Sequence, residues 1–205
     1  MRALYALRRY ARRPAPKSPR CELCAAHIGD EHAHVVELGP RRIRCACPPC
    51  ALLFRSPEAG GGRYRTIPDR VRIDPALRID VARWEALGIP VRLAFLLKNR
   101  AIGKWVAVVP SPAGPVEMVL EASVEALGDS PLFEEVEDDV EALLVWGRRG
   151  DEALQCVLAP VDRCYALVGR LRTRFGGFDG AEALAEVEAF VADLLQRAQP
   201  VRRWA

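Results

Sequence analysis

Most of the residues that could do chemistry are concentrated in one short stretch near the start of the chain. Cys21 and Cys24 form one Cys-x2-Cys pair, and Cys47 and Cys50 form a second. Two such pairs let four thiolates converge on one tetrahedral ion, for which zinc is the usual occupant. We therefore predict a metal site made of these four cysteines, with zinc expected and iron as the alternative. A module with two disulfides or free thiols is the competing interpretation, which a reducing cytoplasm disfavours.

Three further residues of this stretch have more than one possible role. Cys45 lies two residues before Cys47, so an extended strand would place both side chains on one face and make Cys45 a reserve ligand. Cys45 could equally be a reduced thiol of the hairpin or a thiol that contacts the ligands without binding the ion. His32 and His34 would also share a face in an extended segment. They are metal ligands, groups that hydrogen-bond to ligands, or polar loop residues, and the sequence leaves these alternatives open.

The rest of the chain shows no pattern of catalytic residues. Residues 51–205 contain no histidine, which excludes a Ser-His-Asp or Cys-His catalytic set built from that part. Gly60–Gly62 lacks the spacing of a phosphate-binding loop. The acidic run 133–139 is expected to be a solvated loop. The alternatives are a divalent-cation site, a surface for a basic partner, or pairing within the molecule with the basic leader or with the arginines of 63–72. We identify no catalytic residue and expect the protein not to be an enzyme.

The sequence between the two cysteine pairs predicts the scaffold of the metal site. Residues 35–38, a Gly39-Pro40 turn and residues 43–46 form a hairpin pattern, and a helix begins after Cys47. A first cysteine pair, a hairpin, and a helix whose first turn carries the second pair are typical of treble-clef or zinc-ribbon-like modules. The helix N-terminus also favours thiolates through its free N–H groups.

The second half of the chain predicts an α+β domain. Short turns between successive strands indicate antiparallel neighbours, and we expect a five-stranded antiparallel sheet with helices packed on one face. Asp179 and Glu182 predict a capping box for the last helix, and Cys164 is expected in the core. The predicted strands span 91–98, 104–109, 116–120, 140–146 and 153–158, and the predicted helices span 80–87, 161–174 and 180–198.

Composition sets the domain boundaries. The 205 residues carry a net charge of +3 that hides opposing blocks, since 1–20 are basic without an acid and 105–147 are acidic without a base. No apolar run could span a membrane, and no signal-peptide pattern is visible, so we expect a cytoplasmic protein. The expected divisions are a flexible leader 1–20, a four-cysteine metal-binding module 21–58, a Gly/Arg-rich linker 59–70, an α+β domain 71–198 and a tail 199–205.

Several segments together resemble an uncharacterised family of high-GC bacteria, a domain of unknown function. The resemblance spans about residues 2–197 and implies an accessory role, because the genes of that family tend to accompany nickel–iron hydrogenase genes. It implies no established activity and no catalytic residue. The segments that carry it are Cys21-Glu-Leu-Cys24, His32-Ala-His34, Cys45-Ala-Cys47-x2-Cys50, Gly60-Gly-Gly-Arg-Tyr-Arg65, Ala86-Leu-Gly-Ile-Pro90, Pro110-Ser-Pro-Ala-Gly114 and Gly176-Gly-Phe-Asp-Gly180.

Three functional hypotheses follow. The first is a zinc-binding accessory protein that docks on a protein partner, namely a hydrogenase subunit or maturation factor. The second is a rubredoxin-like iron protein that carries single electrons. The third is nucleic-acid binding through the basic leader and the Arg-rich stretch 41–72, which is the least expected because an acidic stretch directly follows the leader.

Overall fold

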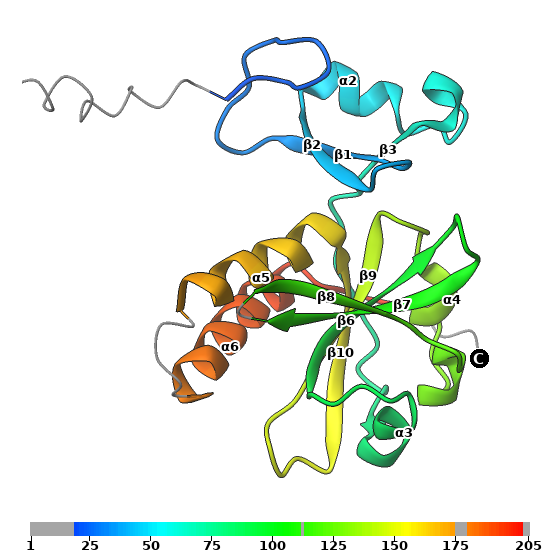
Figure 1. Ribbon diagram of the computed structural model, residues 1–205, viewed down its shortest axis with the longest axis vertical. Helices are drawn as coiled ribbons and strands as arrows, with labels where there is room; N and C mark the ends of the chain where they lie inside the picture. The colour runs from blue at the N-terminus through cyan, green and yellow to red at the C-terminus, as the bar shows by residue number, and fades with distance from the viewer. Residues whose placement is uncertain (1–18, 112, 175–179, 203–205) are drawn as a thin grey trace, which may run out of the picture.

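The computed structural model describes residues 19–111, 113–174 and 180–202. A small module with three strands and one short helix lies above a larger unit built around a twisted sheet (Figure 1). The basic leader up to residue 18 and the proposed capping residue Asp179 lie outside the described residues. None of the described helices is long and apolar enough to cross a membrane.

The small module is a hairpin extended by a third strand. β1 (Ala33–Glu37) pairs antiparallel with β2 (Arg42–Ala46), and β3 (Tyr64–Thr66) pairs with the other edge of β1. The helix α2 (Pro48–Leu53) and the short 3₁₀ helix η1 (Ala59–Gly62) come between β2 and β3 in the chain. Gly60, Gly61 and Gly62 have φ values of 62°, 67° and 71°, a left-handed conformation that lets the chain turn back toward β1. Part of the expected linker therefore completes the sheet of this module.

The larger sheet contains all five strands that we predicted for the α+β domain. These are β6 (Leu93–Asn99), β7 (Lys104–Ser111), β8 (Gly114–Val119), β9 (Glu141–Trp146) and β10 (Ala153–Pro160). In the described part of the chain the order is β11-β4-β10-β9-β6-β7-β8, with β5 pairing to β10. The added strands β4 (Arg72–Ile73), β5 (Ile79–Asp80) and β11 (Gln199–Pro200) have two residues each, too short to show a period. Because β11 pairs parallel to β4, the sheet is mixed rather than purely antiparallel.

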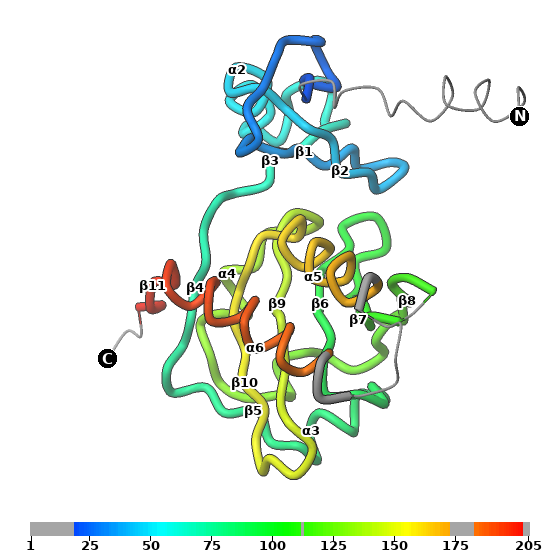
Figure 2. Tube along the Cα trace, turned by 90° about the vertical axis from the view of Figure 1, so that its left-hand side faces the viewer, coloured from blue at the N-terminus to red at the C-terminus, as the bar shows by residue number. Residues whose placement is uncertain are grey.

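Helices cover both faces of this sheet, so the prediction of helices on one face is wrong. α5 (Val161–Arg174) and α6 (Gly180–Gln196) pack on one face. The opposite face is covered by α3 (Val81–Ala86), the 3₁₀ helix η2 (Val124–Leu127) and α4 (Leu132–Glu135) (Figures 1 and 2). Every residue of β9 is buried, which is what two covered faces require. α3 lies within the predicted helix 80–87, whereas η2 and α4 were not predicted because four residues are too few to show a helical period.

The long helices follow the predicted apolar periodicity. The bounds of α5 agree with the prediction, and α6 ends two residues before the predicted end at 198. Cys164 is fully buried in the core between α5 and the sheet, as predicted. The short helix α3 is capped by Asp80, whose carboxylate accepts hydrogen bonds from the N–H groups of Ala82 and Arg83.

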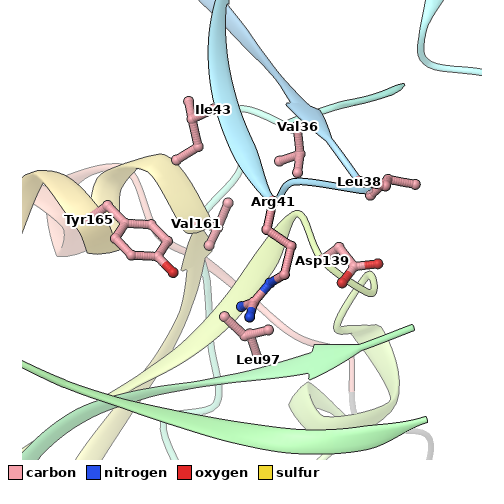
Figure 3. A pocket seen from close by; sticks show the side chains of 8 residues that line it. All are labelled: Val36, Leu38, Arg41, Ile43, Leu97, Asp139, Val161 and Tyr165. Carbon is pink, nitrogen blue, oxygen red and sulfur yellow. The ribbon is translucent and has the colours of Figure 1, made fainter. Parts of the chain in front are cut away.

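The β1–β2 hairpin packs the small module against the larger unit. Val36 of β1 belongs to the same hydrophobic core as α5 and α6, and Leu38 and Ile43 pack against it. Arg41, in the turn between β1 and β2, points toward Leu97, in a cleft that Asp139 also lines (Figure 3). Its guanidinium lies 2.6 Å from the carboxylate of Glu117 on β8.

The acidic run is bound to arginines of the connecting chain and is not a solvated loop. Arg65 Nη2 lies 2.9 Å from Glu137 Oε2, and Arg72 Nε lies 3.1 Å from Glu135 Oε2. Arg70 forms a two-pronged pair with Glu141, at 2.6 Å and 2.7 Å. The alternative of pairing with the arginines of 63–72 is therefore confirmed. Solvation was expected because charge in a sequence does not reveal a partner that lies 63 to 72 positions away.

The pair of Arg70 and Glu141 is expected to be the most costly of these contacts to break. Glu141 is 0% exposed, so Arg70→Ala leaves a buried carboxylate without its partner. We expect a loss of about 2–5 kcal/mol in the free energy of unfolding, measured by urea denaturation. Arg148→Ala removes the more exposed pair with Glu188 and should cost less than about 1 kcal/mol. Equal losses in the two variants would contradict this assignment.

Candidate metal centre

The structure brings the four predicted cysteine ligands together. The sulfur atoms of Cys21, Cys24, Cys47 and Cys50 all lie within 4.8 Å of one another, and those of Cys24 and Cys47 are 3.5 Å apart. Zinc–sulfur bonds of about 2.3 Å in a tetrahedron separate the sulfurs by about 3.8 Å. This four-cysteine cluster therefore has the number, chemistry and spacing of thiols to hold a metal ion.

The first cysteine pair is held in a tight turn. The N–H of Ala25 donates to the carbonyl of Cys21 at 2.8 Å, and Ala25 has a φ of 63°. The N–H of Glu22 donates to the carbonyl of Cys45 at 2.9 Å, which ties the turn to the end of β2. The turn thus holds Cys21 and Cys24 beside the second pair.

The second cysteine pair is positioned by α2. Cys47 is the residue before the helix, and Pro48 and Pro49 occupy its first positions, where no N–H donor is lost. Cys50 follows in the first turn. The N–H of Ala51 donates to the carbonyl of Cys47 at 2.9 Å, so the helix begins directly at the site.

The four thiols differ in their readiness to ionise. Burial opposes ionisation of Cys21, but N–H groups of Cys47, Leu23 and Cys24 donate to its sulfur and lower its pKa to about 6. Burial raises the pKa of Cys50 to about 12, and hydrogen bonds with Cys47 and Cys24 add to the effect. Four neighbouring thiolates repel one another, so a bound cation is what would let all four deprotonate.

Cys45 does not join this group but lies with the two histidines. The ligand atoms of His32, His34 and Cys45 lie within 4.8 Å of one another. Burial raises the pKa of the Cys45 thiol, and the nearby Glu22 carboxylate raises it further. The structure thus separates two clusters where the sequence left Cys45 as a reserve ligand for one. Cys156 and Cys164 are buried core residues, and burial raises the pKa of both thiols.

Sequence reasoning missed a residue that is far from the second cluster in the sequence but forms a hydrogen bond with it. Asp162, the second residue of α5, has its carboxylate 2.8 Å from Nδ1 of His34. The two residues are 128 positions apart, and an acidic residue near a helix N-terminus normally has a local explanation. Only the three-dimensional packing of the hairpin on α5 shows this contact.

The comparisons assign the chain to a family and name no activity. Residues 20–198 match the family described as a family of unknown function (DUF5947), so the chain belongs to that family. No curated protein and no solved structure matches the chain.

Loss of one cysteine ligand should abolish metal binding at the four-cysteine cluster. We expect Cys24→Ser and Cys50→Ser each to lose one tightly bound ion per chain, measured by elemental analysis after gel filtration. Because metal binding contributes to folding, the small module should also become more sensitive to proteolysis. Cys164→Ala removes a buried thiol outside the cluster and should retain the ion. Full metal retention in both serine variants would contradict the ligand assignment.

The conformation of Ala25 predicts a substitution that strengthens metal binding instead of abolishing it. A left-handed backbone is unfavourable for alanine by about 1–2 kcal/mol, and glycine adopts it without that cost. After allowing for the greater freedom of unfolded glycine, we expect Ala25→Gly to tighten metal binding about two- to fivefold. Ala26→Gly, at an equally exposed neighbour without a positive φ, should weaken it slightly. Competition with a chelator measures the metal affinity of both variants. A metal affinity of Ala25→Gly below that of the wild type would contradict this prediction.

Proposed function

We propose that this protein is a zinc-binding accessory protein whose treble-clef-like module docks on a protein partner. The observation that carries the proposal is an exposed apolar pair on the helix that contributes Cys50. Leu52 and Leu53 are 64% and 59% exposed, although α2 has only six residues. Adjacent exposed leucines on so short an element are typical of a contact surface rather than of a helix that serves its own core.

The donor set supports a structural role for the ion. Four thiolates fill a tetrahedral coordination sphere and leave no position for a substrate, as in closed zinc sites. The ion would hold α2 against the first cysteine pair and so fix the orientation of Leu52 and Leu53. Zinc suits this set because it has no redox chemistry and no directional preference from its d electrons.

The choice of partner rests on the family resemblance. It implies association with nickel–iron hydrogenase genes, and the proposed partner is accordingly a hydrogenase subunit or a maturation factor. The rubredoxin-like alternative uses the same four thiolates with iron. Nucleic acid is disfavoured because Arg44, Arg63, Arg65 and Arg70, which lie in the Arg-rich stretch, are held in ion pairs with glutamates of the same chain.

The test is affinity purification of the tagged full-length protein from its native cells. We expect a hydrogenase subunit or maturation factor to be recovered with the wild type and to be lost with the Leu52→Asp, Leu53→Asp double variant. Ile102→Asp changes a similarly exposed apolar residue, 51% exposed, in the turn between β6 and β7 and should leave recovery unchanged. Recovery that is unaffected by the double variant would place the docking surface elsewhere, and recovery of neither partner class would refute the hydrogenase link.

Metal analysis and visible absorption of the same purified protein decide between the two metals. A zinc protein is colourless, whereas a ferric tetrathiolate site absorbs visible light. A stoichiometric iron content with a visible spectrum would favour the electron-transfer alternative.

A further inference from the structure

The pairing of the hairpin strands places His34 and Cys45 side by side. In the register of β1 and β2, His34 lies directly opposite Cys45, and directly opposed residues point to the same face of a sheet. His32 precedes His34 by two residues, and the two imidazole rings are 4.8 Å apart between centroids. Val36 and Ile43 are the next opposed pair on this face, and both belong to or pack against the core of the larger unit. The cluster therefore faces α5, whereas the face with Val35 and Ala46 packs against α2.

The hydrogen bonds of the two imidazoles determine which nitrogen is left for a ligand. Nδ1 of His32 lies 2.9 Å from the carbonyl oxygen of Gly29, which can only accept, so Nδ1 carries the proton. Nδ1 of His34 lies 2.8 Å from the Asp162 carboxylate and donates in the same way. Each neutral imidazole is thus held as the tautomer whose lone pair is on Nε2. This is the arrangement that metal-bound histidines use, with the other ring nitrogen bound to a carbonyl or carboxylate.

The Nε2 atom of His32 is the strongest sign of a ligand. It is buried and, within the described residues, has no hydrogen-bond partner. Leaving a buried acceptor without a partner costs about 1–3 kcal/mol, and a polar loop histidine would avoid that cost by turning to water. A lone pair kept in this position beside a second imidazole and a thiol is suited to an ion.

We propose that His32, His34 and Cys45 form a second metal site, separate from the four-cysteine cluster, for a borderline transition-metal ion such as Zn²⁺. Two imidazoles and one thiolate suit such ions rather than Ca²⁺ or Mg²⁺, which prefer oxygen. The ligand atoms, which lie within 4.8 Å of one another, would approach by up to about 1.5 Å to reach the separations of a tetrahedral site. Binding releases the thiol proton of Cys45 to solvent and changes no oxidation state.

Three protein ligands leave the fourth tetrahedral position open. In zinc proteins this number distinguishes sites that accept water or an exchangeable ligand from closed structural sites. The second site is therefore expected to exchange its ion more readily than the four-cysteine cluster, and to bind a small external donor. It stands on its own residues and does not depend on the docking function proposed above.

Asp162 is assigned as a positioning residue for this site. Its Oδ2 orients His34, and its Oδ1 accepts the N–H of Arg163, which holds the carboxylate at the start of α5. Asp162 belongs to the larger unit and His34 to the hairpin, so an ion bound here would strengthen the contact between the two. Removing the charge of such a partner typically weakens metal affinity by about 10- to 100-fold.

The experiment uses the full chain with the four-cysteine cluster filled by one equivalent of Zn²⁺ and adds Co²⁺ as the probe. We expect one equivalent of Co²⁺ to bind and to give ligand-field bands of a tetrahedral ion, with charge-transfer absorption from a single thiolate. His34→Ala and Cys45→Ser should each abolish these bands while retaining the first zinc ion. Asp162→Asn should keep the stoichiometry and weaken Co²⁺ binding by about 10-fold or more.

Matched controls separate this site from adventitious binding and from misfolding. His27→Ala removes the remaining histidine, which is outside the cluster, and should bind Co²⁺ as the wild type does. Far-ultraviolet circular dichroism and the retained zinc ion show whether each variant is folded. Wild-type protein that gives no tetrahedral Co²⁺ bands beyond the first zinc equivalent would overturn the proposal. Bands that persist in a folded Cys45→Ser variant would overturn it equally.

Discussion

The register of the β1–β2 hairpin is the constraint on which both clusters depend. One face of the hairpin carries Val35 and Ala46 into the small core with α2, and the other carries Val36 and Ile43 into the large core with α5. Because side chains alternate along a strand, a slip of one residue would exchange the two faces. A slip of β2 would turn Cys45 away from His34, and a slip of β1 would turn His34 away from Cys45. Two separate clusters within thirty residues are possible only because this register is fixed.

Charge pairs secure that register and the position of the module. Glu37, at the end of β1, is 3% exposed and is paired with Arg44 of β2 and with Arg63. Hydrogen bonds from Arg44 and Arg63 lower the pKa of the Glu37 carboxylate, so it stays ionised where it is buried. Arg41 and Arg65 extend from the module to Glu117 and Glu137 of the larger unit. Such pairs select one arrangement, because a misplaced module would leave carboxylates without partners.

The sequence predicts well what depends on local pattern and spacing. The clustering of the four cysteines, the five longer strands of the larger sheet and the two long helices follow from Cys-x2-Cys spacing and apolar periodicity. The two-residue strands β4, β5 and β11 are defined only by their neighbours, so they carry no pattern of their own. The cluster to which Cys45 belongs is likewise not determined by the sequence, since its spacing suits either cluster. Its partner is set by the pairing with His34, and the contact of His34 with Asp162 depends on tertiary packing alone.

The size of the small module explains why its metal would matter for docking. In the described part of the chain, its hydrophobic cluster has four buried residues, Val35, Ala46, Ala51 and Phe54, far fewer than an independent domain needs. A helix of six residues is also too short to be stable by itself. α2 therefore depends on the anchoring of Cys47 and Cys50 at one end and on its packing against β1. Leu52 and Leu53 can be presented in a fixed orientation only while that anchor holds. An ion bound at the four-cysteine cluster would therefore act on the proposed partner through α2, without touching the partner itself.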